Sequence, residues 1–200
     1  MSELFDRLAT LFANGHAEPI DGLLSDERFA VAERTADAAV LIAVTDRARP
    51  GIILTQRPHT MRDHPGQVAF PGGKLEPGES AIDAALREAD EELSLAPGLV
   101  RIIGASDRYR TGTGFDITPV LGVVPSDVDL RPDPREVAAW FEAPLDLLLA
   151  RESWRENSVF WRGAERRYLE MEFDGFRIWG VTAAILANLS RRLAWVEAAR

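Results

Sequence analysis

The chain has 200 residues, of which 46% are hydrophobic and 28% charged, an ordinary composition for one globular domain. Its formal charge of −9 argues against broad electrostatic binding to nucleic acid or to an anionic membrane, and cations would have to mediate the binding of an anionic substrate. The absence of cysteine excludes disulfides, zinc–thiolate sites and a thiol nucleophile.

The first segment is predicted to form a short amphipathic helix. Apolar residues recur at helical spacing over 3–13, within an N-terminal helical extension of about residues 1–36, and Gly15 and Pro19 break the pattern. These residues lack the basic and continuous apolar regions of a signal peptide, and no run of the chain approaches the roughly 18 apolar residues of a membrane span. We therefore expect a cytoplasmic protein.

Three strands are expected next. The runs AAVLIAVT (38–45) and GIILTQR (51–57) are rich in β-branched residues, and the turn between them suggests that they are neighbours. A shorter strand, QVAF (67–70), leads into the glycine-rich PGG. Glycine at this point lets the backbone bend sharply or approach a ligand closely.

A helix over 81–93 is the clearest element of the sequence. Ser80 can cap its first turn, and Asp83 three residues later resembles the partner in a capping box. Further strands are expected at about 99–105, 116–124 and 136–142, then a short helix over 143–151 and a longer one over 178–196. Without an internal repeat or linker, this order predicts a single α/β domain over residues 1–200. The aromatic residues between 154 and 179 are expected to pack the C-terminal section, and some could line a pocket.

The helix over 81–93 carries an unusual set of acids in READEEL (87–93). At about 100° per residue, Glu88, Glu91 and Glu92 occupy a sector only about 100° wide beside the apolar stripe. Clustered carboxylates suit Mg²⁺, which takes one or two of them together with waters and substrate phosphates. Arg87 could pair with Glu79 or Glu91 and stiffen such a site. The competing interpretation is a solvated acidic face.

Residues 73–95, GKLEPGESAIDAALREADEELSL, resemble the Nudix box. The positions that fit its fixed residues at the required spacings are Gly73, Glu79, Arg87, Glu88, Glu91, Glu92 and Leu95. Ser94 replaces the usual glycine after the helix, where a left-handed conformation would cost serine about 1 kcal/mol of strain. The resemblance implies a Nudix fold, a mixed β-sheet sandwiched between α-helices, and metal-dependent hydrolysis of a diphosphate linked to another group.

The same resemblance implies roles for the acids. Glu88 and Glu92 would be the main ligands of Mg²⁺ or Mn²⁺, and Glu91 a further ligand or the base that deprotonates water. Glu79 would brace the loop, with Arg87 as its partner. The physical chemistry agrees, because a metal lowers the pKa of bound water and neutralises charge that develops on phosphate oxygens.

Upstream of the box, residues 54–73, LTQRPHTMRDHPGQVAFPGG, resemble a signature of coenzyme A diphosphatases. The implied reaction cleaves coenzyme A or its thioesters to 3′-phospho-AMP and 4′-phosphopantetheine or its acyl form. The groups near the catalytic loop that would bind this small-molecule substrate are Arg57, Arg62, His64, Gln67, Gly72, Gly73 and Lys74. A basic group suits phosphate, although each of these arginines could instead pair with a surface acid.

Two alternatives stay open. A Nudix hydrolase could act on another substrate, such as ADP-ribose or a dinucleoside polyphosphate. A non-catalytic Nudix module for ligand sensing would be expected to have lost acids of the box, and this chain keeps all of them. The sequence does not fix the oligomeric state, and a homodimer is one option.

Overall fold

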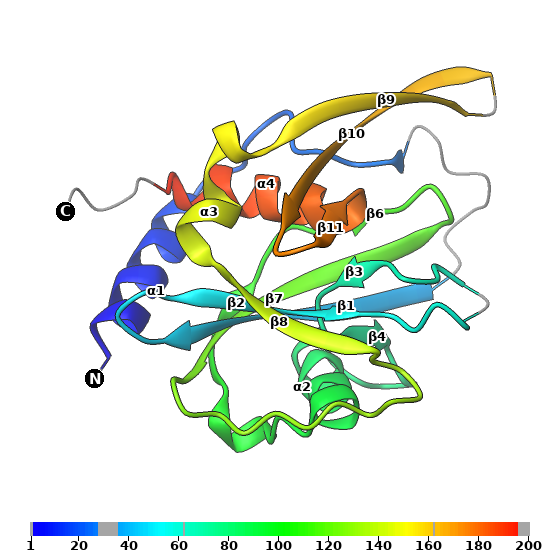
Figure 1. Ribbon diagram of the computed structural model, residues 1–200. Helices are drawn as coiled ribbons and strands as arrows, with labels where there is room; N and C mark the ends of the chain where they lie inside the picture. Colours follow the sequence, from blue (N-terminus) through cyan, green and yellow to red (C-terminus); the bar gives the residue numbers. More distant parts are fainter. Residues whose placement is uncertain (1, 28–35, 62, 162, 196–200) are drawn as a thin grey trace.

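A computed structural model describes residues 2–27, 36–61, 63–161 and 163–195 (Figure 1). The helices are α1 (Glu3–Gly15), α2 (Ala81–Leu93), α3 (Leu145–Leu149) and α4 (Val181–Leu193), with 3₁₀ turns η2 (Pro97–Leu99) and η3 (Arg151–Ser153). The strands are β1 (Ala36–Asp46), β2 (Gly51–Gln56), β3 (Val68–Ala69), β4 (Gly72–Lys74), β5 (Arg101–Ala105), β6 (Tyr109–Arg110), β7 (Phe115–Pro125), β8 (Ala139–Pro144), β9 (Arg155–Trp161), β10 (Ala164–Phe173) and β11 (Phe176–Trp179).

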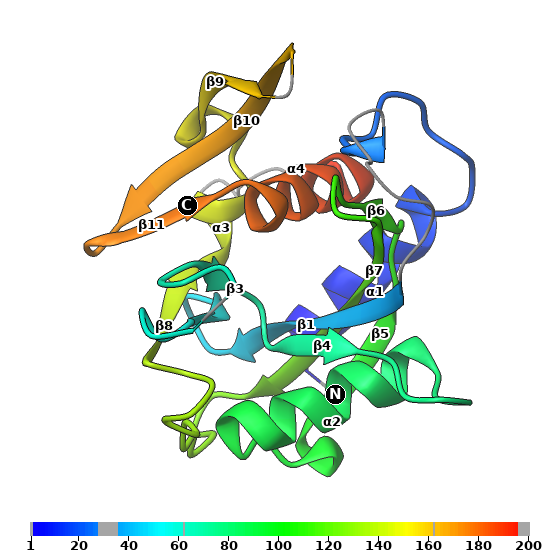
Figure 2. The same cartoon turned by 90° about the vertical axis from the view of Figure 1, so that its right-hand side faces the viewer.

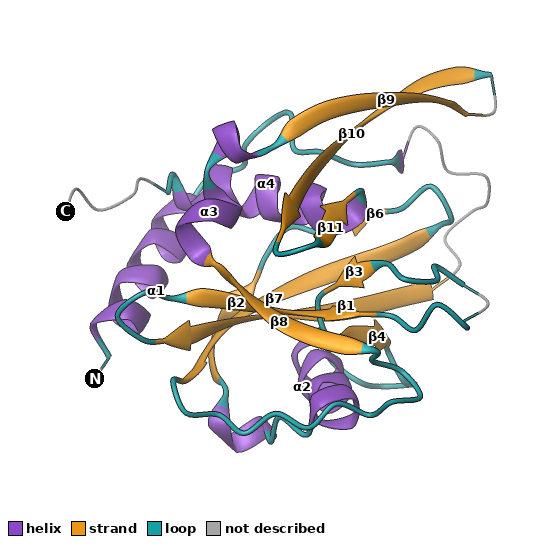
Figure 3. Ribbon diagram, in the orientation of Figure 1, coloured by secondary structure: helices purple, strands orange, loops and turns teal. Residues whose placement is uncertain are grey.

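The main sheet is mixed and has eight strands (Figure 3). Its central path runs β3-β2-β1-β7-β5, while β4, β6 and β8 pair with β1, β7 and β2. The long strands β1 and β7 are parallel over their whole length, and the other pairs are antiparallel. Strand β1 therefore pairs with both the glycine-containing strand β4 and the strand β7, which is distant in sequence, and fixes how the two are aligned.

Helices cover both faces of this sheet, as predicted (Figure 2). Leu41 and Ala43 of β1 belong to the core shared with α2. Ile42 and Val44, one residue out of step, belong to the core shared with α1, α3 and α4. This alternation follows from the two-residue period of a strand, and burial on both faces explains why the run reads as continuously apolar.

The C-terminal third differs most from the sequence-based prediction. A separate antiparallel sheet, β11-β10-β9, lies beyond α4, where no strand was expected. The predicted helix over 178–196 begins only at Val181, because β11 takes up residues as far as Trp179 and Gly180 adopts a φ of 64° at the junction. Trp154 is buried as expected, whereas Phe160 is 76% exposed at the end of the hairpin β9–β10.

The N-terminal segment is helical only in its first part. After α1 the described chain to Asp26 contains no further helix, and residues 28–35 of the predicted helical extension lie outside the described part. Hydrogen bonds hold the segment to α4: Asn188 accepts from the Leu24 backbone N–H through Oδ1 and donates to the Leu24 carbonyl through Nδ2. In the described part of the chain, no helix has the length and apolar character to cross a membrane.

Candidate active site

Two glycines bring the chain close to the carboxylates of α2. A Cβ added at Gly72 would lie 2.4 Å from the Ala39 carbonyl oxygen of β1, and one at Gly73 would lie 2.3 Å from a carboxylate oxygen of Glu88. Both contacts are too close for a side chain, so the Pro-Gly-Gly stretch lets β4 pair with β1 and pass directly beside Glu88.

Helix α2 presents its acids beside a buried apolar stripe, and it spans the residues predicted for it. The Ser80 hydroxyl oxygen accepts from the Asp83 backbone N–H at 3.2 Å, which satisfies one of the free donors at the helix start. Ala85, Ala89 and Leu93 are fully buried against the sheet. This packing fixes the rotation of the helix and with it the direction of the neighbouring acids.

Arg87 binds several groups at once. Its guanidinium donates to both carboxylate oxygens of Glu79, at 2.9 and 3.1 Å, and to the Lys74 carbonyl at 3.1 Å. Nη1 donates to Glu88 and Glu91, at 3.0 Å in each case. Arg87 lowers the pKa of Glu79, with a smaller contribution from the Glu76 N–H. The arginine thereby ties the glycine strand, the loop that follows it and α2 into one unit.

Three carboxylates converge beside this unit. Ligand oxygens of Glu88, Glu92 and Glu136 all lie within 4.8 Å of one another. Glu91 is not a member of this group; its side chain is 55% exposed and pairs with Arg87. The structure thus brings together two of the three predicted metal ligands and adds Glu136 from a distant part of the chain.

Glu136 reaches the site because its loop binds the end of α2. The backbone N–H groups of Arg131 and Asp133 donate to the carbonyls of Leu93 and Glu92, at 2.8 and 2.9 Å. These carbonyls are among those that the end of a helix leaves without an internal partner. A turn follows in which the Glu136 N–H donates to the Asp133 carbonyl at 3.0 Å, and the chain then joins β8.

The site favours a cation. Burial, with the nearby Glu88 charge as the next cause, raises the pKa of Glu92 to about 8, and burial also raises the pKa of Glu88. Glu92 is only 5% exposed, and its Oε2 is buried without a hydrogen-bond partner among the described residues. An unpaired buried carboxylate oxygen among two further carboxylates fits a hard divalent ion, which would supply the missing charge.

Three of the predicted substrate-binding residues, Arg57, His64 and Gln67, lie on the loop between β2 and β3. The Arg57 N–H donates to the Gln67 carbonyl at 3.0 Å, so Gln67 helps close the loop at its base. Arg57 acts electrostatically on Glu92, and its Nε is buried without a hydrogen-bond partner in the described part of the chain. His64 is exposed and adopts a φ of 54° in the turn that precedes Gln67. Arg62 lies outside the described residues.

Lys74 lies at the far end of the glycine strand. Its Nζ is 5.4 Å from the centre of the Phe115 ring, a cation–π distance. The two residues lie on strands that flank β1, in which Lys74 pairs with Ala38 and Phe115 with Ala36. Lys74 is exposed and does not form part of the group of three carboxylates.

Carboxylates that could hold a divalent ion lie next to a loop with basic and hydrogen-bonding groups, an arrangement that suits a phosphorylated small molecule. The chain belongs to the Nudix family, because the NUDIX domain model matches residues 35–161. It is a Nudix hydrolase, an enzyme of the diphosphatase class that cleaves pyrophosphate bonds, and members of the family typically use a divalent metal.

Curated relatives share most of the chain. The uncharacterized Nudix hydrolase NudL of Enterobacter sp. (strain 638) is 41% identical over 157 residues, which cover 78% of this chain and 82% of the relative. NudL of Escherichia coli (strain K12) is 40% identical over the same length and coverage. Among solved structures, the Nudix hydrolase RenU of M. smegmatis is 22% identical, with a TM-score of 0.51 over 64% of this chain and 81% of that one. The last likeness shows the fold.

Proposed function

We propose that the protein hydrolyses the diphosphate bond of coenzyme A or its thioesters, giving 3′-phospho-AMP and 4′-phosphopantetheine or acyl-phosphopantetheine. The observation that carries the proposal is the position of the loop over 57–67. This loop contains the stretch that resembles the coenzyme A diphosphatase signature, and it begins at Arg57, the arginine that acts on Glu92. The loop with this signature therefore begins beside the carboxylates that we propose for diphosphate hydrolysis.

The proposed metal ligands are Glu88, Glu92 and Glu136, with Mg²⁺ or Mn²⁺ as the cation. The metal would supply an activated water and neutralise charge on the phosphate oxygens. Glu136 replaces Glu91 as the third proposed metal ligand, because it lies in the carboxylate group and Glu91, predicted as a further ligand or the base, does not. Glu91 keeps a supporting role as a partner of Arg87.

The remaining residues orient the substrate and the loop. Arg57 is the proposed phosphate-binding arginine, because it acts electrostatically on Glu92 and a guanidinium can bind a phosphate through two parallel hydrogen bonds. Arg87 and Glu79 hold Gly73 and Lys74 against α2. His64 and Gln67 set the shape of the loop, and Arg62 is assigned to substrate binding on the sequence resemblance alone.

The direct test is product identification after incubation with coenzyme A and Mn²⁺ or Mg²⁺. We expect 3′-phospho-AMP and 4′-phosphopantetheine, with rates compared in parallel for coenzyme A, acetyl-coenzyme A, ADP-ribose and NADH. A preference for ADP-ribose of at least about tenfold, or about 1.4 kcal/mol in transition-state binding, would refute the coenzyme A assignment. The Glu92→Gln variant should remain folded and lose nearly all turnover. Near-normal turnover of that variant at saturating Mg²⁺ would refute the metal site.

A further inference from the structure

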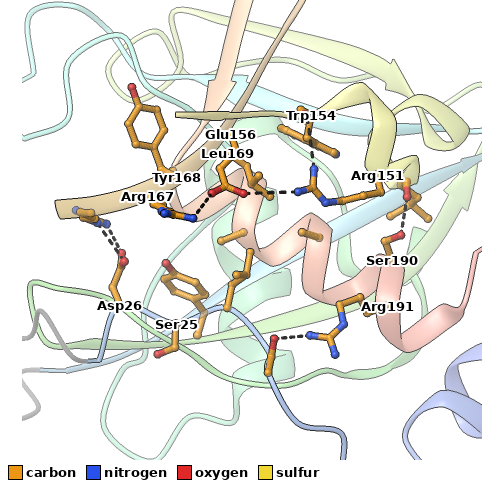
Figure 4. A pocket seen from close by; sticks show the side chains of 18 residues that line it. Ser25, Asp26, Arg151, Trp154, Glu156, Arg167, Tyr168, Leu169, Ser190 and Arg191 are labelled. Carbon is orange, nitrogen blue, oxygen red and sulfur yellow. Dashed lines mark hydrogen bonds and ion pairs between the residues drawn. The ribbon is translucent and has the colours of Figure 1, made fainter. Parts of the chain in front are cut away.

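A pocket of about 550 Å³ lies far from the carboxylates, between α4 and the hairpin β9–β10 (Figure 4). Its volume falls within the range of about 300–1,000 Å³ that is typical of small-molecule sites. Figures 1 and 2 show the hairpin on one side of α4 and the main sheet on the other, with α2 beyond that sheet. The pocket is therefore separate from the hydrolytic site.

The floor of the pocket is apolar and elongated. Gly180 at the start of α4, and Ala184 and Ala187 within it, line the pocket along one face of the helix, which continues to Arg191. At 1.5 Å per residue, the distance from Gly180 to Arg191 is about 16 Å. Leu149, Leu169 and Trp154 add apolar surface from α3, β10 and the turn before β9. This shape suits a single chain that lies along the helix.

At one end of the pocket the charged groups are paired with each other. Asp26 is 6% exposed and accepts from the Arg166 guanidinium. Tyr109, 3% exposed, lies against the same carboxylate, and burial together with the Asp26 charge raises the pKa of this tyrosine. This end therefore offers a neutral, closed wall to a ligand.

The opposite end is positive. Figure 4 shows Arg151 and Arg191 on the same side of the pocket, away from Asp26. The hydrogen bonds of Arg191 go to the backbone carbonyls of Asp21 and Gly22, so its charge has no counter-ion among the described residues. Arg151 lies 3.8 Å from Glu156, which also pairs with Arg167 at 3.2 Å. Four arginines against two carboxylates give the lining a positive excess in a chain of net charge −9.

We propose that this pocket binds an anionic amphiphile, with a carboxylate or phosphate head at Arg151 and Arg191 and an apolar chain along the floor of α4. The positive end attracts the head, and the small side chains at Ala184 and Ala187 leave room for the chain. The inference stands apart from the coenzyme A proposal, because none of the residues involved belongs to the carboxylate site.

The test is isothermal titration calorimetry of the full chain with decanoate, decyl phosphate and decanol, each below its aggregation concentration. We expect the two anions to bind and decanol to bind at least about tenfold more weakly, a difference of about 1.4 kcal/mol. The tighter of the two anions identifies the head group as carboxylate or phosphate. Binding of decanol as tight as that of both anions, or no binding of either anion, would refute the proposal.

Variants locate the bound ligand. Ala187→Phe fills the floor and should weaken both anions at least about tenfold, whereas Ala17→Phe in an exposed turn should not. Arg151→Gln combined with Arg191→Gln should remove the preference for anions over decanol, and Arg131→Gln on an exposed loop should retain it. Glu92→Gln should bind normally, which separates this site from hydrolysis. Unchanged anion binding by Ala187→Phe would show that the amphiphile binds elsewhere and would overturn the inference.

Discussion

Glu136 lies with Glu88 and Glu92 in the carboxylate group, whereas Glu91 lies outside it. Glu136→Gln should raise the Mn²⁺ concentration for half-maximal activity by at least about tenfold, since even groups that merely support metal ligands contribute about 10–100-fold to affinity. Glu91→Gln should change it by less than about fivefold, because an exposed ion pair contributes at most about 1 kcal/mol. Metal titrations of both variants decide between them. A larger effect at Glu91 would restore the role that the sequence assigned to it.

Glu92 should make the stability of the metal-free protein depend on pH. Its pKa is about 8 in the folded state against an ordinary 4.5, so folding favours the protonated form. Its contribution to stability is therefore complete below about pH 4.5 and is lost as the pH rises through 8, by at most about 1.4 kcal/mol per pH unit. Urea unfolding in a chelator should show this decline, and Glu92→Gln should flatten it. Parallel profiles for the two proteins would contradict the burial argument, and added Mn²⁺ should reduce the decline in the wild type.

At the scale of single elements, helix α2 ends in a strained residue. Ser94 adopts φ 55° and ψ 33°, the left-handed conformation for which glycine carries no penalty. Ser94→Gly should raise the free energy of unfolding by about 1 kcal/mol, as measured by chemical denaturation. Ser94→Ala is the matched control, because it also removes the hydroxyl bond to the Arg131 carbonyl but keeps the strain. Equal effects of the two substitutions would mean that strain does not explain the departure from glycine.

Glu136 lies on the loop before β8, and Asp133 stabilises the conformation of that loop. Asp133 accepts from the Arg135 backbone N–H at 2.9 Å, within the turn whose carbonyl also binds the Glu136 N–H. Asp133→Ala should raise the half-saturating Mn²⁺ concentration about fivefold, the equivalent of about 1 kcal/mol for one hydrogen bond. Asp129→Ala in the same loop removes only an exposed ion pair and should have no such effect. Equal metal dependence in both variants would argue against this positioning role.

Local signals explain which elements the sequence predicts. The cap at Ser80 and the apolar stripe define α2 within the chain itself, and the spacing of its acids is fixed by helical geometry. Glu136 carries no such spacing signal, because long-range hydrogen bonds of its loop to α2 bring it to Glu92. Strands β9 and β10 are rich in charges and lack a clear alternation. The sequence does contain a signal for the turn between β10 and β11, because Asp174-Gly175 lies between apolar residues and such a pair indicates a tight hairpin turn. Both residues have a positive φ in the structure.

At the scale of the whole molecule, one arginine joins segments from both ends of the chain. Arg192 of α4 is 7% exposed, and it donates to both carboxylate oxygens of Asp107, at 2.7 and 2.6 Å. The same guanidinium donates to the carbonyls of Gly15 and Glu18, so that α1, the turn after it and the segment after β5 all depend on it. The packing of α1 against α4 brings these groups together, and their separation in the sequence hides the connection.

Removal of Asp107 would leave the buried guanidinium without its counter-ion. Asp107→Ala should lower the free energy of unfolding by about 3 kcal/mol, in the range for breaking a buried ion pair, whereas loss of an exposed pair in Asp129→Ala should cost less than about 1 kcal/mol. Arg192 lowers the pKa of Asp107, so the stability it contributes is present above about pH 3.8 and is lost as the pH falls below that value. Urea unfolding at pH 7 and pH 3 should therefore show a smaller acid-induced loss in Asp107→Ala than in the wild type. A loss of equal size in the two proteins would mean that the ion pair of Asp107 contributes no acid-sensitive stability.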